Sequence, residues 1–283
     1  MENFCFSKVS RENMKLSIFT TMTDPEKRMD PWKEALSCYE DVADEVVSVG
    51  GDWPQEFRFE LIGEKFQEGF NESTGDWVIH MDIDNFFHEK DLLKIRDVLI
   101  KNPNSPSLAF PKYQIFTPDR FNLKAKMCIA LNKRNFPHIK MNGGGDLCQP
   151  TIDNKLISPK NVPYVRIPIW NYDTVFRTKD IIAEDRARFA RAWHRSFKDW
   201  GDRGGGHPEE AYMAWFEMVQ ERYKNHVRKL NFDDHPKYIK NKISNLNETQ
   251  FGYNGFGLKE TSNISKMKFL KSNLNFYYNN YFS

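Results

Sequence analysis

The chain has 283 residues, of which 40% are apolar and 28% are charged, and its formal net charge is +2. This length suits one large α/β domain or two small ones, and the balance of 41 basic against 39 acidic residues argues against a nucleic-acid-binding protein. The absence of a membrane-span-length apolar run, of a signal peptide and of paired cysteine spacings predicts a cytoplasmic protein with reduced thiols.

The first hundred residues are predicted to alternate between strands and helices. The expected strands cover residues 15–21, 44–52 and 76–84, and the expected helices cover 30–43, 64–74 and 89–102. Residues 57–63 fit either a strand or a loop. Asp30 and Pro31 are predicted to begin their helix as N-cap and first-turn proline. Such alternation is typical of a mostly parallel sheet with right-handed crossovers.

The pattern is less regular beyond residue 102. We expect a strand over 107–117, a strand or a helix over 124–134, a loop over 138–152, an extended segment over 164–178, a helix over 179–197 and a glycine loop leading to a helix near Pro208. The chain from about 240 is predicted to be an irregular surface tail. Contact of its basic, aromatic end (266–282) with a membrane surface is the alternative.

The sequence "DWVIHMDIDNFF" (76–87) ends an apolar run with Asp82 and Asp84. Residues two apart in a strand project to the same side, and ligands of open α/β sheets bind beyond the carboxyl ends of strands. Two carboxylates in such a place repel each other unless a hard cation such as Mg²⁺ or Mn²⁺ lies beside them. The pattern therefore predicts a metal–phosphate site. Solvated acids, or a helix cap formed by Asp84 or Asn85, are the structural alternative.

The order of these segments resembles a GT-A glycosyltransferase, most nearly of the inverting family 2 type. The segments that carry the resemblance are "LSIFTTMTD", "ADEVVSVGGDW" and "GFNESTGDWVIHMDIDNFF", within residues 15–100. The resemblance implies an α/β, Rossmann-like GT-A fold, with a mostly parallel central sheet flanked by helices. Residues 1–102 would be the nucleotide-sugar-binding half, 103–240 the acceptor-binding and catalytic half, and 241–283 a tail.

The same resemblance implies transfer of a sugar from a UDP- or GDP-sugar to a hydroxyl of a glycan or another acceptor, with Mn²⁺ or Mg²⁺ as cofactor. Inversion is expected, and a retaining outcome stays open. Thr20 and Thr21 would lie near the nucleotide, with Asp52 in the place of the acidic group after the second strand. Asp82 would contact the ribose or the metal, and Asp84 the metal.

A second acidic pair, Glu209 and Glu210, opens a predicted helix in "GGGHPEEAYMAWF". The helix dipole favours ionised carboxylates there, and a general base must be ionised when it acts. The resemblance implies that Glu210, or else Glu209, deprotonates the acceptor. The competing pair Glu184-Asp185 is interpreted as part of a salt-bridged helix face.

Further candidates follow from the same comparison and from side-chain chemistry. His235 would complete the metal shell, and His207 is a second candidate for phosphate or metal. Arg203 is expected to meet the diphosphate, on a glycine loop (201–206) that closes over the donor. His80 is expected to be buried and hydrogen-bonded. His88 and His194 are expected at the surface, and the residues that would border a sugar or else lie in the core are Asp146, Trp170, Tyr172, Trp193 and Trp200.

Two other functions are compatible with the same sequence. "DIDNFF" resembles the first motif of haloacid-dehalogenase-type phosphatases, in which Asp82 would be the nucleophile. That motif belongs on the first strand, with Thr or Val in the place of Phe86, whereas strands precede it here. The other alternative is a non-catalytic sugar-binding protein on a GT-A frame.

Overall fold

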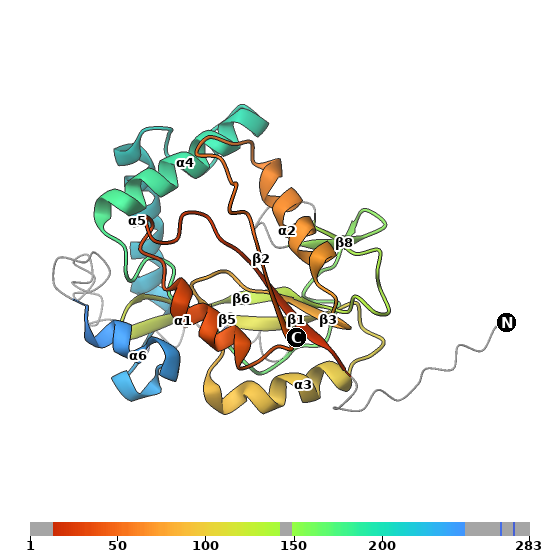
Figure 1. Cartoon of the computed structure of the whole chain (residues 1–283). Coiled ribbons are helices and arrows are strands. Elements are labelled where there is room, and N and C mark those ends of the chain that lie inside the picture. The colour runs from red at the N-terminus through yellow and green to blue at the C-terminus, as the bar shows by residue number, and fades with distance from the viewer. Residues whose placement is uncertain (1–13, 142–148, 247–266, 268–273, 275–283) are drawn as a thin grey trace.

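The computed structural model describes residues 14–141 and 149–246, together with Met267 and Leu274. These residues form an α/β fold with a central sheet flanked by helices (Figure 1). The strands of the central sheet are β1 (Leu16–Thr21), β2 (Glu45–Val49), β3 (Trp77–His80), β4 (Asn85–Phe86), β5 (Ser107–Thr117), β6 (Arg120–Leu131), β10 (Ile169–Asn171) and β11 (Val227–Lys229). A small second sheet contains β7 (Lys140–Met141), β8 (Pro150–Ile152) and β9 (Lys155–Leu156).

The helices surround the central sheet. They are α1 (Trp32–Glu40), α2 (Glu60–Glu72), α3 (Leu92–Ile100), α4 (Lys179–Phe197), α5 (Pro208–His226) and α6 (Lys237–Ser244), with short 3₁₀ turns η1 (Glu89–Asp91) and η2 (Phe232–Asp234). Across the described part of the chain, none of these helices combines the length and the apolar composition that a membrane crossing requires.

The central sheet has the order β2-β1-β3-β6-β5-β10-β4, with β11 paired to β6. Strands β2, β1 and β3 are parallel, as is the pair β5–β10. The pairs that β6 makes with β3, β5 and β11 are antiparallel, as is β10–β4. The predicted Rossmann-like α/β frame is thus confirmed, with its parallel start in β1–β3. Because β3 pairs with β6, the segments before and after residue 102 share one sheet.

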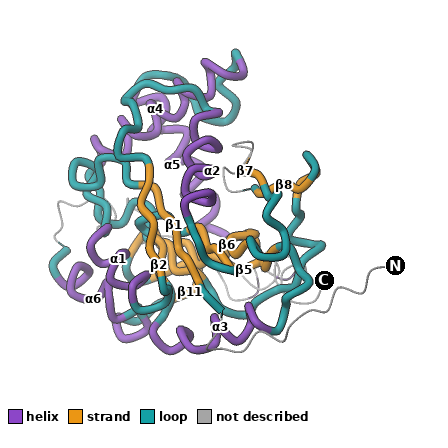
Figure 2. The backbone as a smooth tube through the Cα atoms, turned by 45° about the vertical axis from the view of Figure 1, so that its right-hand side comes forward, coloured by secondary structure: helices purple, strands orange, loops and turns teal. Residues whose placement is uncertain are grey.

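Alternation along β1 gives the sheet two apolar faces, since successive side chains of a strand point to opposite sides. Leu16 and Ile18 pack in the cluster that includes residues of α1, α3 and α6. Phe19 packs in the other cluster, against the α2 residues Phe66 and Phe70. In Figure 2, α1, α3 and α6 lie on one side of the sheet and α2 on the other. This two-sided burial explains why apolar residues of β1 occur on both faces of the strand, with Ile18 and Phe19 adjacent in the sequence.

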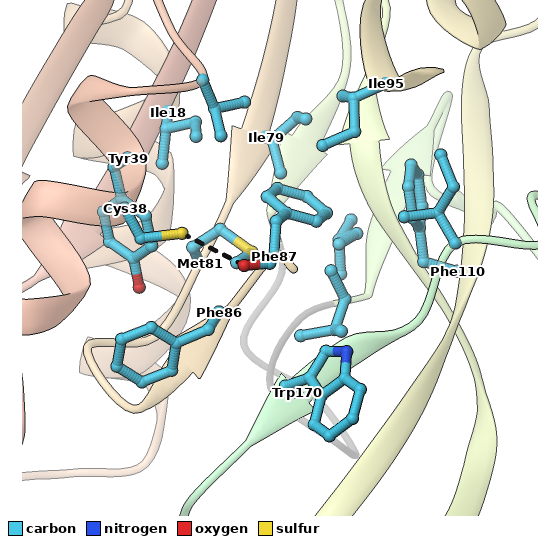
Figure 3. Close-up of a cluster of buried hydrophobic side chains, with 14 of the residues drawn as sticks. Ile18, Cys38, Tyr39, Ile79, Met81, Phe86, Phe87, Ile95, Phe110 and Trp170 are labelled. Atoms are coloured by element: carbon cyan, nitrogen blue, oxygen red, sulfur yellow. Dashed lines mark hydrogen bonds between the residues drawn. The ribbon is translucent and has the colours of Figure 1, made fainter. Parts of the chain in front are cut away.

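The carboxyl end of β3 is embedded in the first of these clusters. Figure 3 shows Cys38 and Tyr39 of α1 beside Met81, Phe86 and Phe87, which precede and follow the two aspartates. Phe86 and Phe87 are completely buried, and the Cys38 thiol lies 3.6 Å from the Phe87 carbonyl. The apolar residues on both sides of the aspartates therefore fix the course of the chain through this segment. Of the other cysteines, Cys128 is also free and buried, whereas Cys5 and Cys148 lie outside the described residues.

Several element predictions need correction. Residues 60–63 are neither strand nor loop but the first turn of α2, because Ile62, Phe66 and Phe70 bury one helical face against the sheet. The ambiguous segment 124–134 is largely strand β6. The irregular tail predicted from about residue 240 begins inside helix α6, of which Ile239 and Ile243 are buried.

The start of α1 also differs from the prediction. Pro31 takes the N-cap position, and no side-chain cap bond is made. The Asp30 carboxylate instead lies in a buried ion pair with Arg177. The Asp30 carboxylate thus pairs with the guanidinium of Arg177, far along the chain, instead of with the backbone amides at the start of α1.

Candidate active site

The two aspartates lie in a turn beyond the end of β3 rather than in the strand itself. The strand ends at His80, and the Asn85 amide donates to the Asp82 carbonyl at 2.8 Å to close the turn. The prediction that both carboxylates project from one strand face is therefore wrong in detail. The turn still lies at the carboxyl edge of the parallel strands, where ligands of such sheets bind.

Hydrogen bonds to its backbone carbonyls hold this turn in place. The Tyr39 hydroxyl lies 2.5 Å from the Asp82 carbonyl and 3.0 Å from the Asn85 carbonyl. The Tyr172 amide donates to the Asp84 carbonyl at 2.9 Å. The capping alternative does not apply, because the following 3₁₀ turn is capped by His88, which accepts from the Lys90 amide. Neither the Asp82 nor the Asp84 carboxylate therefore accepts a helix-capping hydrogen bond.

Asp84 has a perturbed carboxyl group. Its Oδ1 accepts from Asn171 Nδ2 at 2.9 Å. Burial, followed by the nearby charges of Asp82 and Asp173, raises the pKa of Asp84 to about 7. Lys112 and Arg177 oppose this shift without cancelling it. The ionised form of Asp84 is therefore disfavoured, and a cation bound beside it would stabilise that form.

Asp82 faces a different set of groups. His80 Nε2 lies 3.5 Å from its Oδ1, and Lys112 Nζ lies 3.9 Å from its Oδ2. His80, Asn85 and Lys112 line a small cavity with Asp82. His80 is buried as predicted and stacks on Phe19 at 4.8 Å, and this burial lowers the pKa of the imidazole. Among the described residues, however, His80 Nε2 has no hydrogen-bond partner.

The donor set fits a hard divalent ion only in part. Mg²⁺ and Mn²⁺ are often held by one or two carboxylates, with phosphate and water oxygens completing the shell. Asp82 and Asp84 supply two such carboxylates within one turn. Within residues 14–141 and 149–246 no cluster of three or more acidic, histidine or cysteine side chains could hold a metal ion. The substrate would thus have to supply the remaining ligands.

His235 does not have the geometry predicted for a third ligand. It is fully buried, with Nδ1 2.7 Å from the Tyr172 hydroxyl and Nε2 2.9 Å from the Pro118 carbonyl. Both ring nitrogens are engaged in protein hydrogen bonds, so the expected metal coordination is not compatible with this arrangement. Residues 231–234 before it are exposed, but the His235 ring itself is buried and has a structural role through its bonds to Tyr172 and Pro118.

The ends of β1 and β2 form the next part of this edge. Thr21 pairs with Val49, and a methyl group added to Gly50 would lie 3.7 Å from Thr21 and 3.4 Å from the Trp53 ring. Thr20 is completely buried. Among the described residues, neither Thr20 Oγ1 nor Trp53 Nε1 has a hydrogen-bond partner. Two buried polar atoms beside this edge thus lack a hydrogen-bond partner among the described residues, which is uncommon for buried polar groups.

Asp52, in contrast, points to the surface. Its side chain is 77% exposed and pairs with Lys65 at 2.8 Å. The hydrogen bond from Lys65 holds the pKa of Asp52 below its usual range. Trp53, which the sequence reasoning did not select, is the residue of "GGDW" that lies against Gly50.

Helix α4 connects this edge to the glycine loop. Arg188 donates to the Pro54 and Gln55 carbonyls, both at 2.7 Å. Arg191 contacts Glu56, Glu184 and the Gly206 carbonyl. The loop after β2 and the loop before α5 are consequently fastened to the same helix. Glu184 has the salt-bridged role predicted for it, whereas its neighbour Asp185 is buried against Arg177 at 3.2 Å.

Glu209 and Glu210 are exposed in the first turn of α5, as the sequence predicted. Gly204, with φ +77°, makes the turn into the helix, and a Cβ there would lie 2.4 Å from the Glu210 carbonyl. A Cβ on Gly205 would lie 2.1 Å from Glu210 Oε2. The glycines thus let the loop approach the Glu210 side chain, as their run in the sequence suggests.

Arg203 stacks on an aromatic ring, and two of the central aromatics take the core position that was one of their two predicted alternatives. The Arg203 guanidinium lies 3.9 Å over the Trp193 ring and 5.7 Å from Phe59. Trp170 and Tyr172 are buried in the core. Trp200 is 36% exposed, whereas Asp146 lies outside the described residues. Arg203 thus stacks on Trp193 and pairs with Asp202 at 3.2 Å, and its contact with a diphosphate stays a prediction.

The remaining histidines differ from one another. His88, expected at the surface, is buried beside Trp170 at 5.7 Å. His194 is partly buried and stacks on Trp200. His207 is exposed. The apolar residues around position 88 could have indicated burial, because "NFFHEKDLL" surrounds it with large side chains.

Asp173 is a neighbour of Asp84 that sequence reasoning missed. Its two carboxylate oxygens each lie 3.1 Å from Arg186 Nη2, and its charge contributes to the raised pKa of Asp84. The sequence gives no direct signal for this proximity, because Asp84 and Asp173 are 89 residues apart. The pairing of β4 with β10 and the hydrogen bonds from Asn171 and Tyr172 to Asp84 bring the two segments together.

Comparisons with known proteins add little to this geometry. No protein-family model matches the chain, and no curated protein sequence matches it. Among solved structures, it is similar to the crystal structure of S. aureus TarS 1-349, with a TM-score of 0.33 and 10% sequence identity, over 95% of this chain and 93% of that chain. A likeness at this level says nothing about activity.

Proposed function

We propose that the chain is a metal-dependent glycosyltransferase that moves a sugar from a nucleotide-diphosphate donor to an acceptor hydroxyl. The observation that carries the proposal is the Asp82–Asp84 turn at the carboxyl edge of three parallel strands, in which the pKa of Asp84 is raised. A desolvated carboxylate such as that of Asp84, with a second carboxylate nearby, is costly to ionise unless a cation compensates it. A divalent ion held by Asp82 and Asp84 would stabilise the charge of the departing diphosphate.

The chain's own residues would bind and orient the donor. Thr21, which is partly exposed at the end of β1, would lie close to the nucleotide, and the buried Thr20 Oγ1 and Trp53 Nε1 lie near the same edge of the sheet without a hydrogen-bond partner among the described residues. Arg188 keeps the loop that carries Trp53 close to α4. Asp52 and Arg203 have no part in this proposal, because their side chains are directed to Lys65 and Trp193.

Proton transfer is assigned to α5. Glu210, or else Glu209, would accept the proton of the attacking hydroxyl, because both carboxylates are exposed at the helix N-terminus. By the resemblance to family 2 enzymes, we expect a single displacement with inversion at the anomeric carbon.

The test is a thermal-shift titration of the full chain with UDP, GDP and ADP, each with and without MnCl₂. A ligand that binds the folded state raises Tm in proportion to its saturation. We expect UDP or GDP to raise Tm only when the metal is present, and Asp84→Asn to abolish the effect. Asp233→Asn, which changes an exposed acid of η2, serves as the control.

No response to any nucleotide at saturating metal would contradict the proposal. Assays of the same proteins also distinguish the two alternative functions, a phosphatase and a non-catalytic sugar-binding protein. Release of phosphate from a phosphomonoester, abolished in Asp82→Asn, would indicate a phosphatase. Nucleotide-sugar binding without turnover, unaltered in Glu210→Gln, would indicate a sugar-binding protein on this frame.

A further inference from the structure

A group of aromatic side chains lies where α4 ends and the glycine loop begins. We call it the Trp200 platform, and it consists of Trp193, His194, Phe197 and Trp200. The His194 and Trp200 rings stack at 4.2 Å with 17° between their planes, and the Trp193 and Phe197 rings lie 4.1 Å apart. Phe197 is 46% exposed and Trp200 36%. Two large aromatic residues are therefore held rigidly at the surface rather than buried in the core.

The platform is adjacent to Glu210. A Cβ on Gly206 would lie 2.7 Å from Trp200 Cη2, and a Cβ on Gly205 would lie 2.1 Å from Glu210 Oε2. The Trp200 ring and the Glu210 carboxylate thus rest against consecutive residues of one loop. Since neighbouring Cα atoms are about 3.8 Å apart, the two groups are separated by on the order of 10 Å. A short oligosaccharide can span that distance.

The chemistry around the platform matches a sugar. The C–H face of a pyranose meets the negative face of an indole ring favourably, while its hydroxyl groups require polar partners at the rim. Asp199 accepts from Trp193 Nε1 at 2.8 Å, and Asp202, with a side chain 93% exposed, lies beside Arg203 at 3.2 Å. Carboxylate oxygens fixed beside an aromatic surface provide such partners.

We propose that the Trp200 platform is a carbohydrate subsite, which holds one sugar ring of an oligosaccharide acceptor while the neighbouring ring presents its hydroxyl to Glu210. The inference rests on the proposed glycosyl transfer and names its acceptor as an oligosaccharide rather than a lone sugar or a small aglycone. Glycine at 205 and 206 allows this arrangement, because a Cβ at either position would crowd Glu210 or the Trp200 ring.

The experiment is calorimetric titration of the full chain with cello-, chito- and manno-oligosaccharides of increasing length. We expect at least one series to bind more tightly as the chain grows beyond a monosaccharide. Trp200→Ala should weaken the longer members of that series about tenfold and leave the monosaccharide unchanged, because only the stacked ring is lost. Trp200→Phe, which keeps an aromatic ring, should lie between the two.

The matched control is Phe232→Ala, which removes an aromatic side chain that is 48% exposed in η2. Equal affinities of the wild type and Trp200→Ala, or no binding of any series to the wild type, would overturn the inference. A change in the sedimentation coefficient of Trp200→Ala with unchanged sugar affinity would do so as well, since it would indicate contact between copies of the chain.

Nucleotide-dependent stabilisation, measured on the same proteins, separates this inference from the proposed function. If nucleotides with metal stabilise the chain while the dependence of affinity on oligosaccharide length is the same in Trp200→Ala as in the wild type, the platform assignment is wrong and the transferase proposal stands. If oligosaccharides bind through Trp200 but no nucleotide stabilises the chain, the acceptor role falls together with the transferase proposal.

Discussion

The Arg191 guanidinium donates to the Glu56 carboxylate through Nε at 3.0 Å and Nη2 at 2.7 Å, although 135 residues separate the two. The same guanidinium donates to the Gly206 carbonyl at 3.0 Å. One side chain of α4 thereby connects the loop that follows β2 with the loop that leads into α5. If the nucleotide binds beside the first loop and the base lies on the second, Arg191 sets their relative position.

The Arg191–Glu56 pair is expected to be coupled but weak in stability. Both side chains are partly exposed, so solvent screens the attraction, and a double-mutant cycle with Arg191→Ala and Glu56→Ala should give about 0.5–1 kcal/mol. Urea unfolding measures this energy. Amide exchange should increase both at residues 54–57 and at 204–206 in Arg191→Ala, and in neither segment in the control Arg58→Ala, whose ion pair with Glu60 is exposed. Faster exchange in only one segment would contradict the coupling.

Asp84 should make stability depend on pH. Its folded-state pKa of about 7 lies above the ordinary value of 3.8, so the folded chain keeps a proton that the unfolded chain has lost between these values. Stability therefore falls as pH rises through this window. Asp84→Asn retains the Oδ1 acceptor for Asn171 and removes this cost, so its Tm should exceed that of the wild type at pH 8 and match it near pH 4.

Magnesium should have the opposite pH profile in the wild type. Protonated Asp84 is a poor ligand, so stabilisation by saturating MgCl₂ with UDP or GDP should be small at pH 5.5 and grow toward pH 8. Thermal denaturation across this range measures both effects. A nucleotide response that is independent of pH would show that Asp84 does not titrate in the binding site.

Glu210→Gln should abolish turnover without loss of donor binding. Removal of a general base typically lowers kcat by about 10²–10⁴, whereas the nucleotide-dependent Tm shift should be unchanged. Glu209→Gln should have a smaller effect, and Glu217→Gln, an exposed acid on the same helix, should have none. If Glu209→Gln loses more activity than Glu210→Gln, the base is Glu209. Equal activity in all three variants would exclude a base on α5.

Tyr172→Phe tests the structural role of His235. The variant removes the hydroxyl that lies 2.7 Å from His235 Nδ1 and leaves a buried ring nitrogen without that partner, at a cost of about 1–3 kcal/mol. Tyr238→Phe, whose hydroxyl donates to the exposed Asp41, should cost less. The metal-dependent nucleotide response should survive in both. Loss of that response in Tyr172→Phe but not in Tyr238→Phe would indicate that His235 contributes to metal binding.

Local periodicity explains which elements could be predicted. The bounds of β5 and α4 agree with the sequence expectation, because a long apolar strand and a helix with a regular buried face need no distant partner to be identified. Residues 57–63 misled the prediction because Phe57, Phe59 and Leu61 alternate as in a strand. Helix α2 forms there instead, since packing of Ile62 and Phe66 against Phe19 outweighs the local pattern.

The same distinction applies to the candidate site. The sequence by itself determined the alternation of strands and helices over the first hundred residues, the apolar residues that enclose Asp82 and Asp84, and the acidic opening of α5, because these are patterns over a few residues. Only the tertiary structure decided that Asp173 lies near Asp84, that His235 is occupied by Tyr172 and that Arg191 meets Glu56. Each of these contacts joins residues more than 60 positions apart, and such a pairing exists only after the sheet and helices have brought the segments together.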